Sequence, residues 1–292
     1  MALGTGLNYP MTQYKPAPLP GGVIDGEIGE ALLTQGVYDV SSTQNYMLGT
    51  MFKSKTGKKF RYNLNGSVIL GASGSTGLLT QAPADDTHFV TQTQTYNYVN
   101  AVKGSYEIAV DIATGSTAVE NSLAGGRLVV VSGALPGFGD AYEIVASKID
   151  ATDTCMHLLL ATALRTSFAA TTVISLYANP YSKVVVWPHG STLKKLTGFT
   201  VAPSPYSAVG VVPAANYFWG QTAGETPVLV DSTNPAAGIP IMPSAATDGA
   251  VADANYATTG TTGVTTLGVP IIGTMRNIGA SGYVGLADIC ID

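Results

Sequence analysis

Glycine and proline punctuate the whole sequence and leave no long uninterrupted segment. There are 34 Gly and 16 Pro among the 292 residues, and both residue types weaken or break helices. The short apolar runs between them are rich in Val, Ile, Thr, Tyr and Phe, which favour strands. Residues 59–64 alternate apolar and polar side chains, whereas 184–187 is continuously apolar, as in a strand buried on both faces. The sequence therefore predicts an all-β fold.

The segments predicted as strands end at turn signals along most of the chain. They are Val37–Val40, Tyr46–Met51, Lys59–Asn63, Val68–Gly71, Tyr106–Ile112, Arg127–Val131, Tyr142–Ala146, Met156–Leu160, Thr172–Tyr177, Lys183–Trp187, Tyr217–Gln221, Pro227–Asp231, Gly238–Met242, Leu267–Met275 and Tyr283–Ile291. We expect at most one short helix, for which Leu158–Phe168 has suitable apolar spacing.

Three regions are predicted from composition. Prolines at positions 10, 16, 18 and 20 fix φ and remove backbone donors, which favours an extended N-terminal arm over residues 1–35. Small polar residues and prolines mark further boundaries near Gly71–Asp86 and Pro203–Pro213. We predict a main β domain over 36–210 and a C-terminal β domain over 211–292, each sandwich-like or barrel-like.

The arm carries anchoring side chains between its prolines. We predict that it binds a neighbouring subunit, since preset φ values lower the entropy cost of docking. The alternative is a flexible terminus. The predicted interface residues are Tyr9, Met11, Tyr14, Lys15, Leu19 and, outside the arm, Trp219.

Charged residues make up only 11% of the chain, less than half the usual share of about 25%. Surfaces with few charges are easily desolvated, which suits permanent protein–protein contact; the alternative is a secreted protein with an adhesive surface. The net charge is −5, and the one local basic group comprises Lys53, Lys55, Lys58, Lys59 and Arg61. We therefore expect no nucleic-acid partner.

No apolar run of about 20 residues occurs, and the first residues do not resemble a secretory signal, so we expect neither membrane association nor secretion.

Motifs for catalysis or cofactor binding are weak. The three histidines, at positions 88, 157 and 189, have no metal-ligand spacing. Cys155 and His157 would stand side by side on a strand, where nothing orients a base. Cys155 and Cys290 are expected to be reduced and buried, although one long-range disulfide is an alternative. We predict no enzyme activity, no cofactor, no metal and no catalytic residues.

Three groups of segments share a recognisable strand pattern. The first is Gln44–Thr50, followed by Gly57–Tyr62 and Leu79–Gln81. The second runs from Asp140–Ile144 through Leu158–Leu160, Leu164 and Val173–Leu176 to Asn179–Tyr181. The third comprises Ala215–Thr222, Val228–Asp231, Pro243–Ser244, Leu267–Val269 and Gly282–Leu286. In this order and spacing, the three groups resemble head decoration proteins of tailed bacteriophages.

This resemblance implies a structural virion protein that decorates and stabilises the capsid from the outside, without catalysis. It also implies assembly in the host cytoplasm, the major capsid protein as partner, and association with itself as a homotrimer. Two other functions stay open: a tail-fibre or receptor-binding protein, and a secreted β-sandwich that binds or hydrolyses carbohydrate, with Trp187 and Trp219 as candidate sugar-stacking residues. We interpret both tryptophans as strand or interface anchors. A shell-forming capsid protein would need a long spine helix, which the sequence does not predict.

Overall fold

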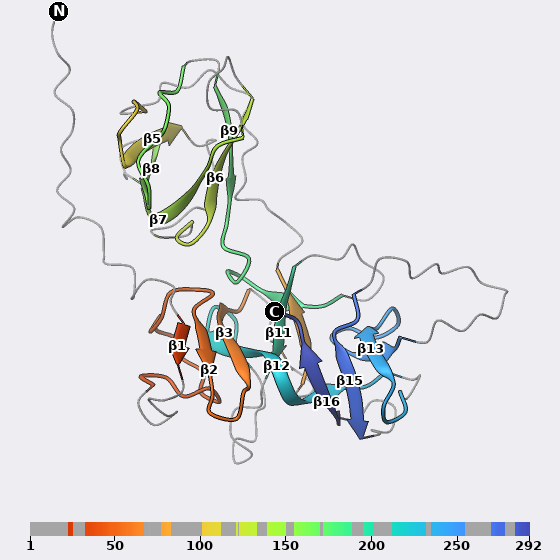
Figure 1. Ribbon diagram of the computed structural model, residues 1–292. Helices are drawn as coiled ribbons and strands as arrows, with labels where there is room; N and C mark the ends of the chain where they lie inside the picture. The colour runs from red at the N-terminus through yellow and green to blue at the C-terminus, as the bar shows by residue number, and fades with distance from the viewer. Residues whose placement is uncertain are drawn as a thin grey trace, which may run out of the picture. The chain divides into compact units, whose positions relative to one another are not determined.

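The computed structural model describes about three fifths of the chain, and its strands are drawn as arrows in Figure 1. The described residues are 23–25, 33–66, 70, 77–82, 101–111, 121, 123–132, 139–149, 155–169, 172–188, 195–200, 212–231, 235–254, 270–277 and 284–292. Within these ranges there is no helix, and the strands form two sheets, which confirms the all-β prediction. The helix candidate Leu158–Phe168 is wrong: Leu158, Leu159 and Leu160 belong to a strand, and the described residues after them are irregular.

The chain forms two compact units that are interleaved in sequence. Unit 1 comprises residues 1–20 and 85–179, and unit 2 comprises residues 21–84 and 180–292. The passage between the units at residue 84 falls within the predicted boundary Gly71–Asp86. Strands on both sides of the other predicted boundary, at residue 210, pair within the sheet of unit 2.

Unit 1 contains a five-stranded antiparallel sheet of order β5-β8-β7-β6-β9. Its strands are β5 (Glu107–Asp111), β6 (Arg127–Ser132), β7 (Ala141–Ile149), β8 (Cys155–Leu160) and β9 (Val173–Tyr177). In β8, Met156, Leu158 and Leu160 are buried while His157 and Leu159 are half-buried, which is the period of two expected for a strand with one face on the core. One apolar cluster, which includes Met156, Leu158 and Leu160, forms the core of the unit.

Unit 2 contains a branched sheet of eleven described strands. Its main path runs β1-β2-β3-β12-β16-β15-β13-β14, and β4, β10 and β11 join it beside β12. All pairs are antiparallel except β1 with β2. The strands are β1 (Val23–Asp25), β2 (Met51–Lys53), β3 (Lys59–Leu64), β4 (Leu79–Gln81), β10 (Val185–Val186), β11 (Leu196–Thr200), β12 (Tyr217–Leu229), β13 (Pro240–Pro243), β14 (Val251–Asp253), β15 (Gly273–Asn277) and β16 (Val284–Cys290).

The long strand β12 joins the two halves of this sheet (Figure 1). Its first residues, Tyr217–Ala223, pair with β3, and its last residues, Ala223–Leu229, pair with β16. An aromatic cluster therefore lies at one end of β12, and a mainly aliphatic cluster at the other. The aromatic cluster contains Tyr46, Phe52, Phe60, Tyr62 and Trp219.

Candidate interaction surface

The predicted interface residues divide into two groups. The arm residues Tyr9, Met11, Tyr14, Lys15 and Leu19 lie outside the described residues. Trp219 is only 1% exposed and packs in the aromatic cluster of unit 2, where its indole Nε1–H donates to the carbonyl oxygen of Gln35 at 3.2 Å. It is therefore a core anchor of β12, and a partner could not contact its ring.

Trp187 is buried in the same way. It is 3% exposed, and its Nε1–H donates to the carbonyl oxygen of Ser244 at 3.1 Å. Neither tryptophan thus presents a face to a sugar, and burial of this kind follows from the apolar strand pattern around each residue.

The residues considered for chemistry lie apart or in structural roles. His157 lies on β8 with its Nδ1 3.6 Å from Glu107 Oε1 on the neighbouring strand, while His88 and His189 lie outside the described residues. Cys290 is a free thiol and is exposed, so the prediction that it is buried is wrong. In the part of the chain that the structure describes, no three His, Cys, Asp or Glu side chains form a group that could hold a metal ion. No helix suited to crossing a membrane is present among the same residues.

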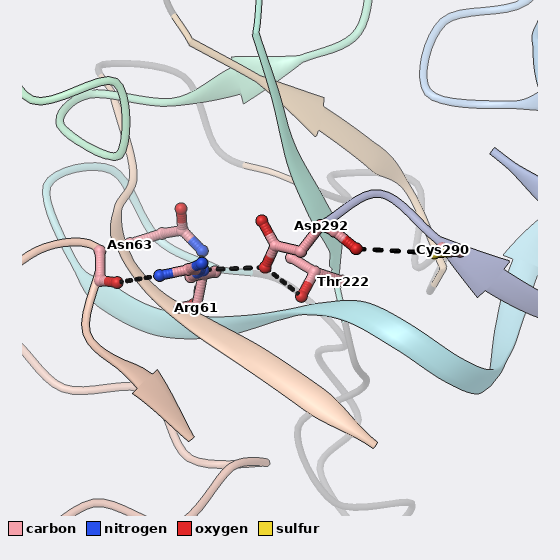
Figure 2. A network of polar contacts seen from close by, with 6 residues as sticks. Arg61, Asn63, Thr222, Cys290 and Asp292 are labelled. Carbon is pink, nitrogen blue, oxygen red and sulfur yellow. Dashed lines mark hydrogen bonds and ion pairs between the residues drawn. The ribbon is translucent and has the colours of Figure 1, made fainter. Parts of the chain in front are cut away.

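A polar network centred on Arg61 fastens the strands of unit 2 (Figure 2). Arg61 Nε donates to Asp292 Oδ2 at 2.8 Å, and Arg61 Nη1 donates to the carbonyl oxygen of Gly49 at 2.9 Å. The hydroxyl of Thr222 on β12 donates to the same Asp292 oxygen at 2.8 Å. Asn63 Nδ2 donates to the carbonyl oxygen of Arg61 at 2.8 Å. The network therefore joins β3, β12, the loop before β2 and the residues after β16.

The last residue of the predicted arm, Gln35, is buried and bonded to the sheet, so this end of the 1–35 segment belongs to unit 2. Gln35 Oε1 accepts hydrogen bonds from the Tyr62 hydroxyl at 2.7 Å and from Asn45 Nδ2 at 3.2 Å. Its Nε2 donates to the carbonyl oxygens of Asp39 at 2.9 Å and Tyr217 at 3.0 Å. Burial of the phenol raises the pKa of Tyr62 well above its usual value. A fully bonded amide at this position fixes residues 33–50 to the aromatic cluster.

An apolar patch lies on the outward side of β12 and β16. Along β16, Val284 and Leu286 are 42% and 38% exposed, whereas Gly285 between them is buried. Leu286 lies opposite Pro227 of β12, which is also exposed. We name Pro227, Val284 and Leu286 the outer patch. These exposed apolar side chains lie on two paired strands, and covering apolar surface of this kind with a partner would be favourable.

Charged residues border the outer patch. Arg276 of β15 lies 3.8 Å from Glu225 Oε1 and 3.5 Å from Asp288 Oδ2. All three side chains are about half exposed, so these ion pairs contribute little to folding. The arrangement, with an apolar centre and a polar border, is typical of protein–protein interfaces.

Comparison with protein-family models, curated proteins and solved structures finds no match to this chain.

Proposed function

We propose that this chain is a non-enzymatic structural protein of a tailed-phage virion that decorates and stabilises the capsid by binding the outer surface of the shell. The observation that carries the proposal is the outer patch, where Val284 and Leu286 are exposed side by side with Pro227. The chain has only 11% charged residues, so removing water from such a face costs little free energy. Covering its apolar side chains with a partner lowers the free energy of the complex.

The second support is the way in which residues 33–50 are fastened. Gln35 bonds to Tyr62, Asn45 and two backbone carbonyls, and Arg61 bonds to the loop at Gly49. If the arm binds a neighbouring subunit, a force on it would pass directly into the aromatic cluster. Clamps of this kind need only weak contacts, because many copies act together on one particle.

In this role the partners are the major capsid protein and other copies of the chain, as a homotrimer. The protein would work on the exterior of the capsid after assembly in the host cytoplasm. The role requires no cofactor, nucleic acid or membrane. The three blocks that resemble decoration proteins favour this function over a tail fibre or a carbohydrate-binding module.

A reconstitution experiment tests the proposal. Purified chain is added to phage heads that lack it, and copies per head are counted by cryo-electron microscopy and quantitative mass spectrometry. We expect saturable binding with on the order of hundreds of copies per head. Association with tails in tens of copies or fewer would favour a fibre component, and recognition of sugars on a glycan array without binding to heads would favour a carbohydrate-binding module.

A further inference from the structure

The hairpin that joins β2 to β3 concentrates positive charge. Lys53, Lys55, Lys58 and Lys59 fall within seven consecutive positions, in a chain with only 14 Lys and Arg residues and a net charge of −5. Lys53 and Lys55 are exposed, and Lys58 and Lys59 are half-buried. We name these four residues the lysine hairpin.

The turn of the lysine hairpin is held in one conformation by hydrogen bonds. The backbone N–H of Ser54 donates to the carbonyl of Lys58 at 2.9 Å, and the N–H of Gly57 donates to the carbonyl of Ser54 at 3.0 Å. The Ser54 hydroxyl accepts from the N–H of Lys58 at 3.1 Å. The stem of Lys58 packs on Gly224, where an added Cβ would lie 3.1 Å from Lys58 Cγ. The backbone that carries the four lysine side chains is thus held in a defined conformation.

The four charges have no compensation in the described residues. No described carboxylate forms an ion pair with any of them, whereas the next basic residue, Arg61, is paired with Asp292. Lys53 also lies directly opposite Lys59 in the β2–β3 register, and like charges placed opposite each other destabilise a strand pair. In the backbone register, the residue of β1 that pairs with Lys53 is Asp25. A local cost of this kind, with no compensating ion pair among the residues that the structure describes, is typical of a functional site.

We propose that the lysine hairpin docks on a carboxylate-rich surface of a partner protein. The positive region is short: seven residues span at most about 23 Å even when fully extended, and here they fold back in a turn. A nucleic acid would extend past this region and meet a chain whose remaining charge is strongly negative. A compact acidic patch on a protein matches both the size and the charge. This inference deepens the proposed function, on which it rests only for the identity of the partner, which would be a shell subunit.

The test uses the full chain and a fluorescent polyglutamate peptide as the acidic probe, with binding followed by anisotropy at two salt concentrations. We expect saturable binding that weakens with salt. The double variant K55Q/K58Q should raise the dissociation constant for polyglutamate at least about fivefold, because each exposed ion pair contributes roughly a factor of two to five to the affinity. The matched control K103Q/K148Q makes the same charge change in unit 1 and should change the affinity by less than about twofold. Thermal unfolding of both variants verifies that they fold.

Three results would overturn the inference: no binding of polyglutamate by the wild type, an equal loss in both double variants, or tighter hairpin-dependent binding to a DNA duplex of equal charge. The binding of unmodified chain to phage heads is scored separately. A wild type that fills heads but ignores polyglutamate would overturn this inference alone. A wild type that binds polyglutamate through the hairpin but leaves heads empty would overturn the proposed function alone.

Discussion

Arg61 and Asp292 are joined by a 2.8 Å ion pair although 231 positions separate them in sequence. Arg61 lies on β3 and Asp292 follows β16, and β12 runs between these two strands in the sheet. Thr222 of β12 donates to the same carboxylate oxygen. The pair therefore spans three strands, and its side chains are 23% and 16% exposed, so water screens it only in part.

Removal of this carboxylate should lower stability. We expect Asp292→Asn to reduce the free energy of unfolding by about 1.5–3 kcal/mol, since hydrogen bonds to charged groups contribute in that range. Asp288→Asn is the matched control: its carboxylate lies 3.5 Å from Arg276 and is 48% exposed, so the loss should stay below about 0.5 kcal/mol. Urea denaturation of both variants measures the difference. Equal losses would show that the Arg61 network does not stabilise unit 2.

Loss of the Gln35 side-chain amide should lower the free energy of unfolding substantially. Gln35→Ala removes four hydrogen bonds, two accepted by Oε1 and two donated by Nε2, and leaves the buried Tyr62 hydroxyl without its acceptor. We expect a loss of about 2–3 kcal/mol and faster hydrogen exchange of the amides in 33–50. Gln44→Ala, which removes one hydrogen bond to the Tyr46 carbonyl and a long contact with Tyr217, should cost less than half as much. Unchanged exchange in Gln35→Ala would contradict the role of this residue as a clamp.

Local patterns predicted most of the central strands. The alternation in 59–64 and the apolar run after residue 127 coincide with β3 and β6, because period-two burial leaves a direct trace in the sequence. The strands predicted at 37–40 and 46–50 are wrong, because these residues form turns and irregular segments. Val37 and Tyr46 are apolar because they pack in the aromatic cluster, and apolar spacing alone does not distinguish such packing from a strand.

Long-range relationships could not be predicted in the same way. Nothing local shows that β3 pairs with β12, because the register of this pair depends on segments far apart in sequence. Residues 85–179 of unit 1 lie in sequence between the two parts of unit 2, and composition along the chain does not reveal this interleaving. The lysine cluster can be recognised in the sequence, but only the structure shows that none of its four charges forms an ion pair with a described carboxylate.

Alanine substitution at two glycines with similar φ angles should distinguish the cost of backbone strain from the cost of steric overlap. Gly57 has φ 83° and nothing within 4 Å of an added Cβ, whereas at Gly77, with φ 71°, the Cβ would lie 2.5 Å from the carbonyl oxygen of Pro227. Gly57→Ala should therefore cost about 1 kcal/mol from backbone strain. Gly77→Ala should cost at least about 2 kcal/mol more, because a backbone atom of β12 must move. Thermal or urea unfolding measures both, and equal costs would contradict the tight packing at Gly77.

Buried phenols predict a loss of stability at alkaline pH. Burial raises the pKa of Tyr62, Tyr142 and Tyr217 above the ordinary value near 10. The folded chain then keeps protons that the unfolded chain releases, so stability is fully present below pH 10 and falls as the pH rises further. The slope should reach at most about 1.4 kcal/mol per pH unit for each tyrosine.

Urea unfolding between pH 9 and 11 tests this dependence, and Tyr62→Phe should make the decline shallower than in the wild type. Tyr106→Phe is the control, since Tyr106 is 55% exposed and its substitution should leave the slope unchanged. An identical slope for the wild type and Tyr62→Phe would contradict the burial of the Tyr62 phenol.

Substitution of the outer patch should separate binding from folding. In Val284→Ser/Leu286→Ser both replaced side chains are substantially exposed, so the free energy of unfolding should change by less than about 0.5 kcal/mol per site. Binding to phage heads should weaken at least about tenfold, because two apolar contacts that are covered only in the complex are lost. Val102→Ser, at a position 61% exposed in unit 1, makes the same chemical change and should leave binding unaltered. Full occupancy by the double variant would show that the outer patch faces solvent on the particle, and the contact with the shell would then have to lie on another face of the chain.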